Sequence, residues 1–173
     1  MDKKEARSNS LRDRRKVDYV NRSKNVVKYI IDNNILDKFN NIGIYYPIGT
    51  EINIMDLMKH YKNKNFYLPK TLDEIEFIKY DLDDELIDGP FNTKEPKGNS
   101  VNRDLIDCYI IPCVAISKNN QRIGYGKGYY DRYLKGYLGK KIGVCYKELS
   151  NLDFKCDEWD LYLDYVIVGW LDV

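Results

Sequence analysis

Histidine and cysteine are scarce in this chain, which limits the metal and redox chemistry open to it. The 173 residues include a single histidine, His60, and four cysteines, none of which form a C-x-x-C pair. A zinc site built from cysteine and histidine ligands is therefore excluded. We expect all four thiols to be reduced, as is usual in a cytosol.

An excess of charge of one sign and a long apolar run are also missing. The chain has 28 basic and 27 acidic residues and a formal net charge of +1, so it carries no overall electrostatic signature of nucleic-acid or membrane binding. No apolar run reaches the roughly 18 residues typical of a membrane span, and the charged start does not resemble a signal peptide. We therefore expect a soluble, cytoplasmic monomer that acts on small molecules, with neither nucleic acid nor a membrane as its partner.

The segment of the chain that is richest in functional signals is RIGYGKGYYDRYL, which begins at Arg122. Its three glycines, Gly124, Gly126 and Gly128, alternate with larger residues ahead of a helical pattern at 129–137. Glycine allows tight turns in which successive N–H groups point at an anion, and a helix N-terminus favours negative charge. The spacing therefore predicts a phosphate-binding loop, called the glycine loop below (residues 122–131).

Charged residues in the glycine loop support a nucleotide ligand. Arg122 and Lys127 provide positive charge, and Asp131 provides a carboxylate suited to Mg²⁺. The spacing is neither that of a Walker A loop, which needs Lys-Ser or Lys-Thr after its last glycine, nor that of a dinucleotide fingerprint. A glycine-rich turn between a strand and a helix, without a ligand, is the structural alternative.

Alternating helical and strand patterns predict the fold. The predicted helices are 3–34, with a break near 17–21, then 53–61 and 129–137; the predicted strands are 42–46, 66–68, 75–80, 108–111, 141–146 and 165–169. This order predicts one α/β domain over residues 1–173, with a mostly parallel central sheet flanked by helices and an N-terminal basic helix. The short break before residue 75 allows a hairpin, and residues 81–101 are predicted to form a long irregular loop.

The basic residues of the N-terminal helix are not spread evenly around it. Lys3, Arg7 and Arg14 fall within roughly 40° of one another at about 100° per residue, so they share one face. Such a face can meet a triphosphate. A basic face that is merely solvated is the alternative.

Several motifs, in their order and spacing, make the chain resemble the 5-formyltetrahydrofolate cyclo-ligases, also called 5,10-methenyltetrahydrofolate synthetases. The resemblance runs nearly end to end and has the glycine loop as its most specific part. Its other parts are the basic N-terminus, YYPIGTE at 45–51, LPK at 68–70, EP at 95–96, IPCVA at 111–115 and DEWD at 157–160. The chain departs from the family at Trp159, where histidine is usual.

The resemblance implies an ATP- and Mg²⁺-dependent reaction. The formyl oxygen of 5-formyltetrahydrofolate attacks the γ-phosphorus of ATP, and N10 then closes the ring to give 5,10-methenyltetrahydrofolate, ADP and phosphate. The substrate supplies both nucleophiles, so no protein nucleophile is needed.

The resemblance, together with the motifs, also implies a set of site residues. The implied ATP contacts are Lys3, Arg7, Arg14, Arg122, Gly124, Gly126, Lys127, Gly128, Tyr129 and Tyr130. The implied folate contacts are Tyr46, Glu51, Phe91, Tyr125, Gly126, Lys127, Gly128 and Tyr129. Asp131 and Asp160 are the implied Mg²⁺ ligands, and Lys127 and Arg122 the implied catalytic residues.

Structural explanations compete for several of these residues. Glu51 stands where a helix is predicted to begin, so its carboxylate could serve only the helix N-terminus. Asp131 and Asp160 could each be a helix cap. Two other functions remain open: an RNA-binding module in which tyrosines stack on bases, and an ATP-dependent kinase of another small metabolite.

Overall fold

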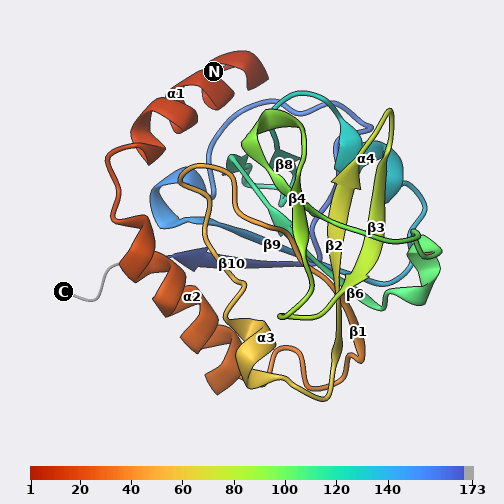
Figure 1. Ribbon diagram of the computed structural model, residues 1–173. Coiled ribbons are helices and arrows are strands. Elements are labelled where there is room, and N and C mark those ends of the chain that lie inside the picture. The colour runs from red at the N-terminus through yellow and green to blue at the C-terminus, as the bar shows by residue number, and fades with distance from the viewer. Residues whose placement is uncertain (170–173) are drawn as a thin grey trace.

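A six-stranded sheet forms the centre of the molecule in a computed structural model, which describes residues 1–169 (Figure 1). The strand order is β10-β9-β6-β1-β2-β3, and every neighbouring pair is parallel except β2 and β3. The strands are β1 (Asn41–Gly43), β2 (Asn65–Thr71), β3 (Ile75–Tyr80), β6 (Cys108–Pro112), β9 (Lys140–Tyr146) and β10 (Tyr165–Gly169). The prediction of a mostly parallel α/β sheet is confirmed. The predicted domain end at Val173 lies outside the described residues.

Helices flank the sheet, and two of them form the N-terminal tract. The α-helices of residues 1–169 are α1 (Lys3–Arg14), α2 (Tyr19–Asp32), α3 (Leu57–His60) and α4 (Tyr129–Tyr133), and α1 and α2 are those of the N-terminal tract. Asp2 caps α1 by accepting a hydrogen bond from the Glu5 N–H, and Asp18 caps α2. The break between the two helices, at residues 15–18, lies slightly before the predicted 17–21. None of the helices in residues 1–169 is both long and apolar enough to cross a bilayer.

The central strands are buried because helices and loops cover the sheet. All five residues of β6 are buried, and so are five of the seven residues of β9. Nearly continuous apolar runs are what parallel strands covered on both faces require. The hairpin that the sequence allowed is present, since β2 and β3 pair antiparallel from Phe66 and Tyr80 to Thr71 and Ile75.

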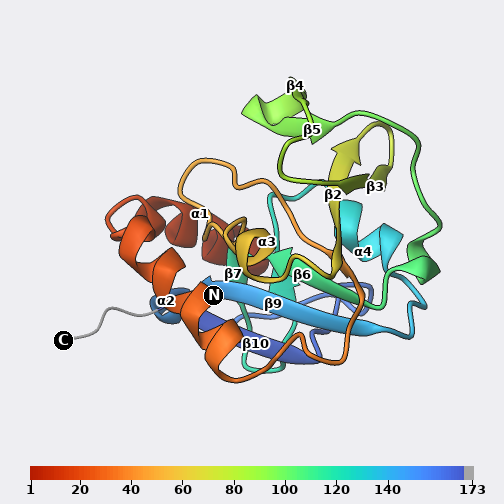
Figure 2. The same ribbon diagram turned by 60° about the horizontal axis from the view of Figure 1, so that its bottom comes forward.

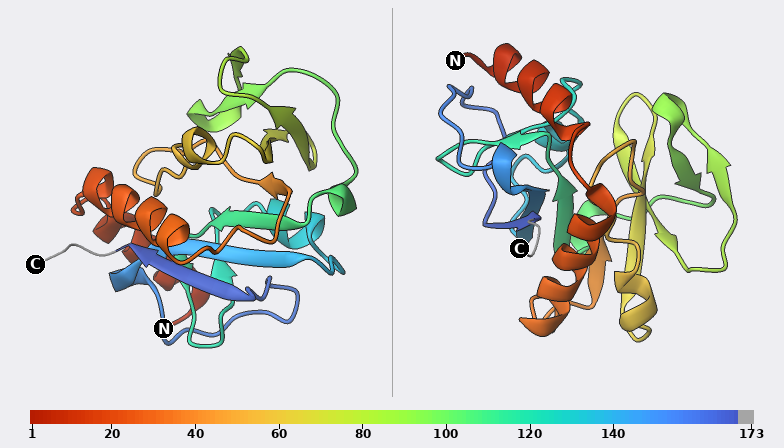
Figure 3. Two further views of the ribbon diagram at one scale, coloured as in Figure 1. Left: turned by 90° about the horizontal axis from the view of Figure 1, so that it is seen from below. Right: turned by 90° about the vertical axis from the view of Figure 1, so that its left-hand side faces the viewer.

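The predicted irregular loop at 81–101 is wrong in part. Its centre forms a second, two-stranded antiparallel sheet of β4 (Leu86–Asp88) and β5 (Lys94–Pro96), joined by a short 3₁₀ turn at Pro90–Asn92. We call residues 86–96 the β4–β5 ribbon. It projects from the β2–β3 edge, on the far side of the molecule from β9 and β10 (Figures 2 and 3). The strands are three residues long and half exposed, so they carry little apolar periodicity in sequence.

Two predicted helices are shorter than expected. The segment 53–61 is helical only at Leu57–His60, because the Asn53 side chain accepts a hydrogen bond from the Met55 N–H and holds a turn. The segment 129–137 is helical only to Tyr133, and Gly136 takes a left-handed conformation with φ of 75°.

The order in which the chain adds strands to the sheet changes direction between β1 and β6. It builds outward from β1 through β2 to β3, then returns to the other side of β1 with β6 and continues to β9 and β10. Because β1 and β6 are parallel, their carboxyl ends lie at the same edge. Ligands of open α/β sheets bind at such a switch point. A third, two-stranded sheet, β7 (Ala115–Ile116) and β8 (Arg122–Ile123), leads into the glycine loop.

Candidate active site

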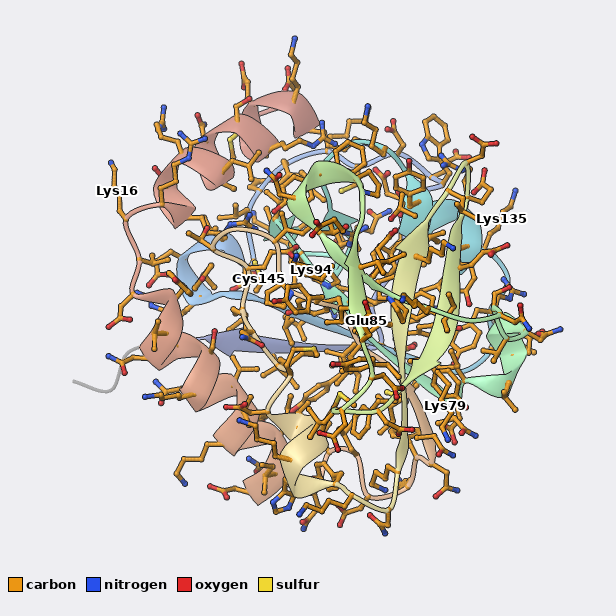
Figure 4. The ribbon with its side chains drawn as sticks, in the orientation of Figure 1. Lys16, Lys79, Glu85, Lys94, Lys135 and Cys145 are labelled. Atoms are coloured by element: carbon orange, nitrogen blue, oxygen red, sulfur yellow. The ribbon has the colours of Figure 1, made fainter. Side chains whose placement is uncertain are left out.

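A cavity of about 1010 Å³ opens at the carboxyl ends of β1 and β6. Side chains from α1, the turn after β1, the β4–β5 ribbon, the glycine loop and the 158–162 segment line it. Lys94 of the ribbon and Lys135, beyond α4, also line it. Both side chains are labelled in Figure 4. A single drug-sized ligand needs roughly 300–1,000 Å³, so this cavity has room for more than one small substrate.

The three glycines of the loop have different physical roles. Gly126 and Gly128 have φ of 101° and 71°, values that glycine adopts without a steric penalty. Gly124 is needed for a close approach instead, since a Cβ there would lie 2.5 Å from a guanidinium nitrogen of Arg122. The loop therefore has the backbone freedom that the sequence predicts. The helix behind it, α4, has only five residues and contributes a smaller dipole than expected.

Arg122 is held rigidly in the wall of the cavity. It is 7% exposed, and its Nε and Nη2 donate to the Pro112 carbonyl oxygen at 3.2 and 2.8 Å. The guanidinium carbon also lies 5.0 Å from the centre of the Tyr130 ring, in cation–π range. Arg122 and Tyr130 both line the cavity, on elements that leave them little freedom.

The basic face of α1 divides between two places. Lys3 and Arg7 line the cavity, and the Arg7 Nε donates to the Gly124 carbonyl at 2.9 Å. Arg14 does not line it; the residue is buried and donates to Thr50 and Tyr125. Seven residues of helix separate Arg7 from Arg14, about 10 Å along the axis, so a shared face does not bring all three cations to one ligand.

The structure places the two predicted metal ligands on neighbouring segments. The Asp131 Oδ1 accepts from the Leu161 N–H at 2.8 Å, next to Asp160, and both aspartates line the cavity. Asp131 bonds a different segment, so the explanation as a helix cap is wrong for it. No group of three or more histidine, cysteine, aspartate or glutamate side chains in residues 1–169 could hold a metal ion. Two carboxylates plus phosphate oxygens and waters are nevertheless a normal Mg²⁺ set.

Lys3 is the counterion of Asp157 and Asp160. Its Nζ lies 2.9 and 2.8 Å from the two oxygens of Asp160 and 2.7 Å from Asp157. Burial lowers the pKa of Lys3, but these two carboxylates outweigh burial and the net pKa is raised. Asp157 was not among the predicted site residues, although it opens the DEWD motif. A lysine and an aspartate 154 residues apart give no local signal of their contact.

The predicted folate contacts come from the turn after β1, the β4–β5 ribbon and the glycine loop. Tyr46, Phe91, Tyr125 and Tyr129 all line the cavity, and Phe91 is 56% exposed on the ribbon. Lys127 also lines it, with its backbone carbonyl held at 2.8 Å by Arg132. Arg132, which was not predicted, lies 5.4 Å from the Tyr129 ring centre. The Arg132 guanidinium thus covers part of the Tyr129 ring, and the aromatic rings that line the cavity are of the kind that stack against a planar ligand.

Glu51 is a buried carboxylate at the base of the cavity. It is 5% exposed and lies in a turn rather than at a helix start, so the explanation through a helix dipole is wrong. Its Oε1 accepts from the Ile48 N–H at 2.7 Å. Burial raises its pKa to about 7, against the lowering effects of that hydrogen bond and of Arg14 and Arg122. At a pH near its pKa a buried carboxyl group is partly ionised, and the carboxylate can accept hydrogen bonds from a ligand with two adjacent N–H donors.

Thiol nucleophiles play no part in this site. Cys113, behind the loop, is 5% exposed, and burial raises its pKa to about 11. It is therefore protonated near neutral pH. All four cysteines are free thiols, as expected.

Relatives of known type share this chain's sequence and fold. A family model described as the 5-formyltetrahydrofolate cyclo-ligase family matches residues 2–169. A 5-formyltetrahydrofolate cyclo-ligase of Mycoplasma pneumoniae is 37% identical over 131 residues, which cover 73% of this chain and 71% of the relative. The enzyme of the same name from Haemophilus influenzae is 30% identical, with 75% of each chain covered.

Solved structures of proteins with the same type of name have the same fold as this chain. A 5,10-methenyltetrahydrofolate synthetase from Mycoplasma pneumoniae superposes with a TM-score of 0.79 at 30% identity, covering 96% of this chain and 98% of the other. The synthetase from Aquifex aeolicus gives 0.85 at 31% identity, covering 97% and 90%. The fold and the cavity are those of a small α/β enzyme. The chain belongs to the 5-formyltetrahydrofolate cyclo-ligase family.

Proposed function

We propose that this enzyme converts 5-formyltetrahydrofolate to 5,10-methenyltetrahydrofolate, with consumption of ATP and release of ADP and phosphate. One observation carries the proposal: a single cavity is lined both by groups that suit a nucleotide, the glycine loop, Lys3, Arg7 and two aspartates (the loop side), and by groups that suit a folate, Tyr46, Glu51 and Phe91 (the folate side). The names of its relatives support the same activity.

The loop side of the cavity suits the phosphates of ATP. Backbone N–H groups freed by Gly126 and Gly128, with Lys3, Arg7 and Lys127, offset the charge of the nucleotide tail. The Arg7 Nε donates to the Gly124 carbonyl oxygen, which ties the helix to the loop. Tyr129 and Tyr130 add aromatic surface to this wall.

The chemistry then requires positioning more than reactive side chains. The formyl oxygen attacks the γ-phosphorus, ADP leaves, and N10 attacks the activated carbon as phosphate departs. Lys127 is exposed at the loop tip, where its ammonium can reach the formyl or phosphate oxygens, and Arg122 fixes the wall beneath it. Both act through charge, as phosphoryl transfer generally demands.

Mg²⁺ fits the aspartate pair. Asp131 and Asp160 would hold it, and the ion would neutralise charge on the phosphates when bound. Lys3 now neutralises Asp160, so nucleotide binding would have to draw the Lys3 ammonium from the carboxylate to a phosphate oxygen.

The folate side of the cavity suits a reduced pterin. The Glu51 carboxylate can accept two N–H donors of the ring side by side, while the Tyr46 and Phe91 rings can pack on its faces. Tyr125, beside Gly126 and Gly128, would contact the substrate where the two halves of the cavity meet.

The decisive experiment follows the absorbance of the methenyl product. The purified protein is incubated with 5-formyltetrahydrofolate, ATP and Mg²⁺, and each component is omitted in turn. We expect product only with all three present. ADP release triggered by a different metabolite would favour a kinase, and salt-sensitive RNA binding without folate-dependent turnover would favour an RNA-binding module.

We also infer a monomeric, cytoplasmic enzyme. The near-neutral charge, the four free thiols and the lack of a membrane-spanning helix in residues 1–169 support this inference. Light scattering after gel filtration would test the monomer, since a mass near twice 20.5 kDa would contradict it.

A further inference from the structure

Arg14 is a buried cation that no part of the proposed chemistry uses. It lies in the last turn of α1 and is 4% exposed. With Glu51 and Tyr146 it lines a separate cavity of about 10 Å³, which has room for at most about one water molecule. A nucleotide phosphate therefore has no access to it there.

The two hydrogen-bond partners of Arg14 belong to different elements of the active site, the turn that carries Glu51 and the glycine loop. Its Nε donates to the Thr50 Oγ1 at 3.1 Å, and Thr50 directly precedes Glu51. Its Nη2 donates to the Tyr125 hydroxyl, and its guanidinium carbon lies 5.6 Å from the Tyr125 ring centre. The Thr50 carbonyl is held in addition by the Tyr146 hydroxyl, from the end of β9.

Three elements thus meet at one guanidinium: the helix that carries Lys3 and Arg7, the turn that carries Glu51, and the glycine loop. We propose that Arg14 is a positioning residue that sets the nucleotide half and the folate half of the cavity relative to each other. This inference rests on the proposed function. Arginine suits the task because its rigid fork can serve two partners in fixed directions, whereas lysine offers a single point charge.

The charge of Arg14 has a second consequence for Glu51. Burial raises the pKa of Glu51, while Arg14 from α1 and Arg122 from β8 lower it. The other titratable groups that face this carboxylate are Tyr45, Cys113, Tyr125, Tyr130 and Tyr146. All of these are neutral near pH 7, because burial raises each pKa. Removing the Arg14 charge should therefore move the ionisation of Glu51 to higher pH.

The test compares Arg14→Lys and Arg14→Met with Arg12→Met, an exposed arginine of the same helix. For both Arg14 variants we expect the KM for ATP and the KM for 5-formyltetrahydrofolate to rise together by about tenfold, the effect of losing a charge-assisted hydrogen bond. The kcat should change less than about threefold. Only Arg14→Met should also move the acid limb of kcat/KM for the folate to higher pH.

If the role of Arg14 were purely structural, Arg14→Met would lower the melting temperature without moving the acid limb of the pH profile of kcat/KM for the folate. Unchanged KM values in Arg14→Lys, or a fall in kcat alone, overturn the inference while leaving the proposed function intact. A wild-type protein without folate-dependent turnover overturns both. If Arg14→Met does not fold, Thr50→Val decides: a raised folate KM supports the inference, and wild-type kinetics contradict it.

Discussion

The glycine-loop side of the cavity and the β4–β5 ribbon are held in place by different forces. On the loop side, buried or half-buried guanidinium groups donate to backbone carbonyls, as Arg122 does to Pro112 and Arg7 to Gly124. The ribbon contains one exposed ion pair, Lys94 with Asp88, and is flanked by another, Lys97 with Glu85. Its one buried polar anchor is the Glu95 carboxylate, which accepts from the Thr71 N–H at 2.6 Å.

This difference agrees with the separate roles that we propose for the loop side and for the ribbon. Phosphoryl transfer depends on groups fixed to within a fraction of an ångström, so they belong on rigid elements. Phe91 of the ribbon is a large exposed aromatic in a left-handed conformation with φ of 60°. The ribbon would supply apolar contact area, which tolerates looser geometry. Substitutions on the loop side should therefore alter kcat. Substitutions in the ribbon should instead alter the affinity for the substrate.

Asp131→Asn should have the largest effect on catalysis. Asparagine keeps the oxygen that accepts from the Leu161 N–H but removes the charge for Mg²⁺. We expect kcat to fall by about two orders of magnitude or more, with little change in stability. Steady-state kinetics over a range of Mg²⁺ concentrations measures the fall. Asp153→Asn, an exposed aspartate paired with Lys118, is the control; a kcat loss equal in both variants would contradict the metal role.

Glu51→Gln should stabilise the fold and weaken folate binding. Burial raises the pKa of Glu51 from 4.5 to about 7, so above pH 7 the folded protein contains a buried charge that costs ~3 kcal/mol. Glutamine keeps the acceptor for the Ile48 N–H without that charge. The stabilisation should therefore be present in full above pH 7, decline as pH falls from 7 to 4.5, and vanish below.

Urea unfolding of Glu51→Gln and wild type at pH 8 and at pH 4.5 checks this dependence. If the difference in unfolding free energy between Glu51→Gln and wild type is the same at both pH values, burial does not destabilise the Glu51 charge in the folded state. The same variant should raise the KM for 5-formyltetrahydrofolate, because an amide cannot accept two N–H donors as a carboxylate does.

Glu95→Ala tests the ribbon and should have a smaller effect. It leaves the Thr71 N–H without its acceptor, which costs about 1–3 kcal/mol, and it loosens the attachment of Phe91. We expect the folate KM to rise by up to about tenfold and kcat to stay near wild type. Stopped-flow or steady-state assays at saturating ATP separate the two. A fall in kcat with unchanged KM would mean that the ribbon takes part in catalysis itself.

Lys97→Met should have the smallest effect of the series. Its partner Glu85 and the lysine itself are both more than half exposed, and exposed pairs contribute little to stability. The urea midpoint and both KM values should match wild type within error. A clear shift in either would show that surface charge, rather than Glu95, attaches the ribbon.

Local patterns were enough to predict the elements whose residues pack in a regular period. The strands at 75–80 and 165–169 were predicted with the bounds that the structure has. The ribbon was missed because its short strands are half exposed and alternate weakly. The helix at 53–61 was overestimated because an asparagine side chain competes with the helical hydrogen bonds.

The sequence by itself determined where backbone freedom, cations and acids would occur along the chain, since glycine spacing and helical periodicity are local properties. Only the tertiary structure decided which of them meet. Lys3 reaches Asp157 and Asp160, and Asp131 reaches Leu161, across long separations in sequence. Arg14 shares a face with Lys3 and Arg7 but is drawn into the interior, because neighbouring elements supply its partners. Contacts of this kind depend on how the sheet closes around the cavity, and no period in the sequence encodes them.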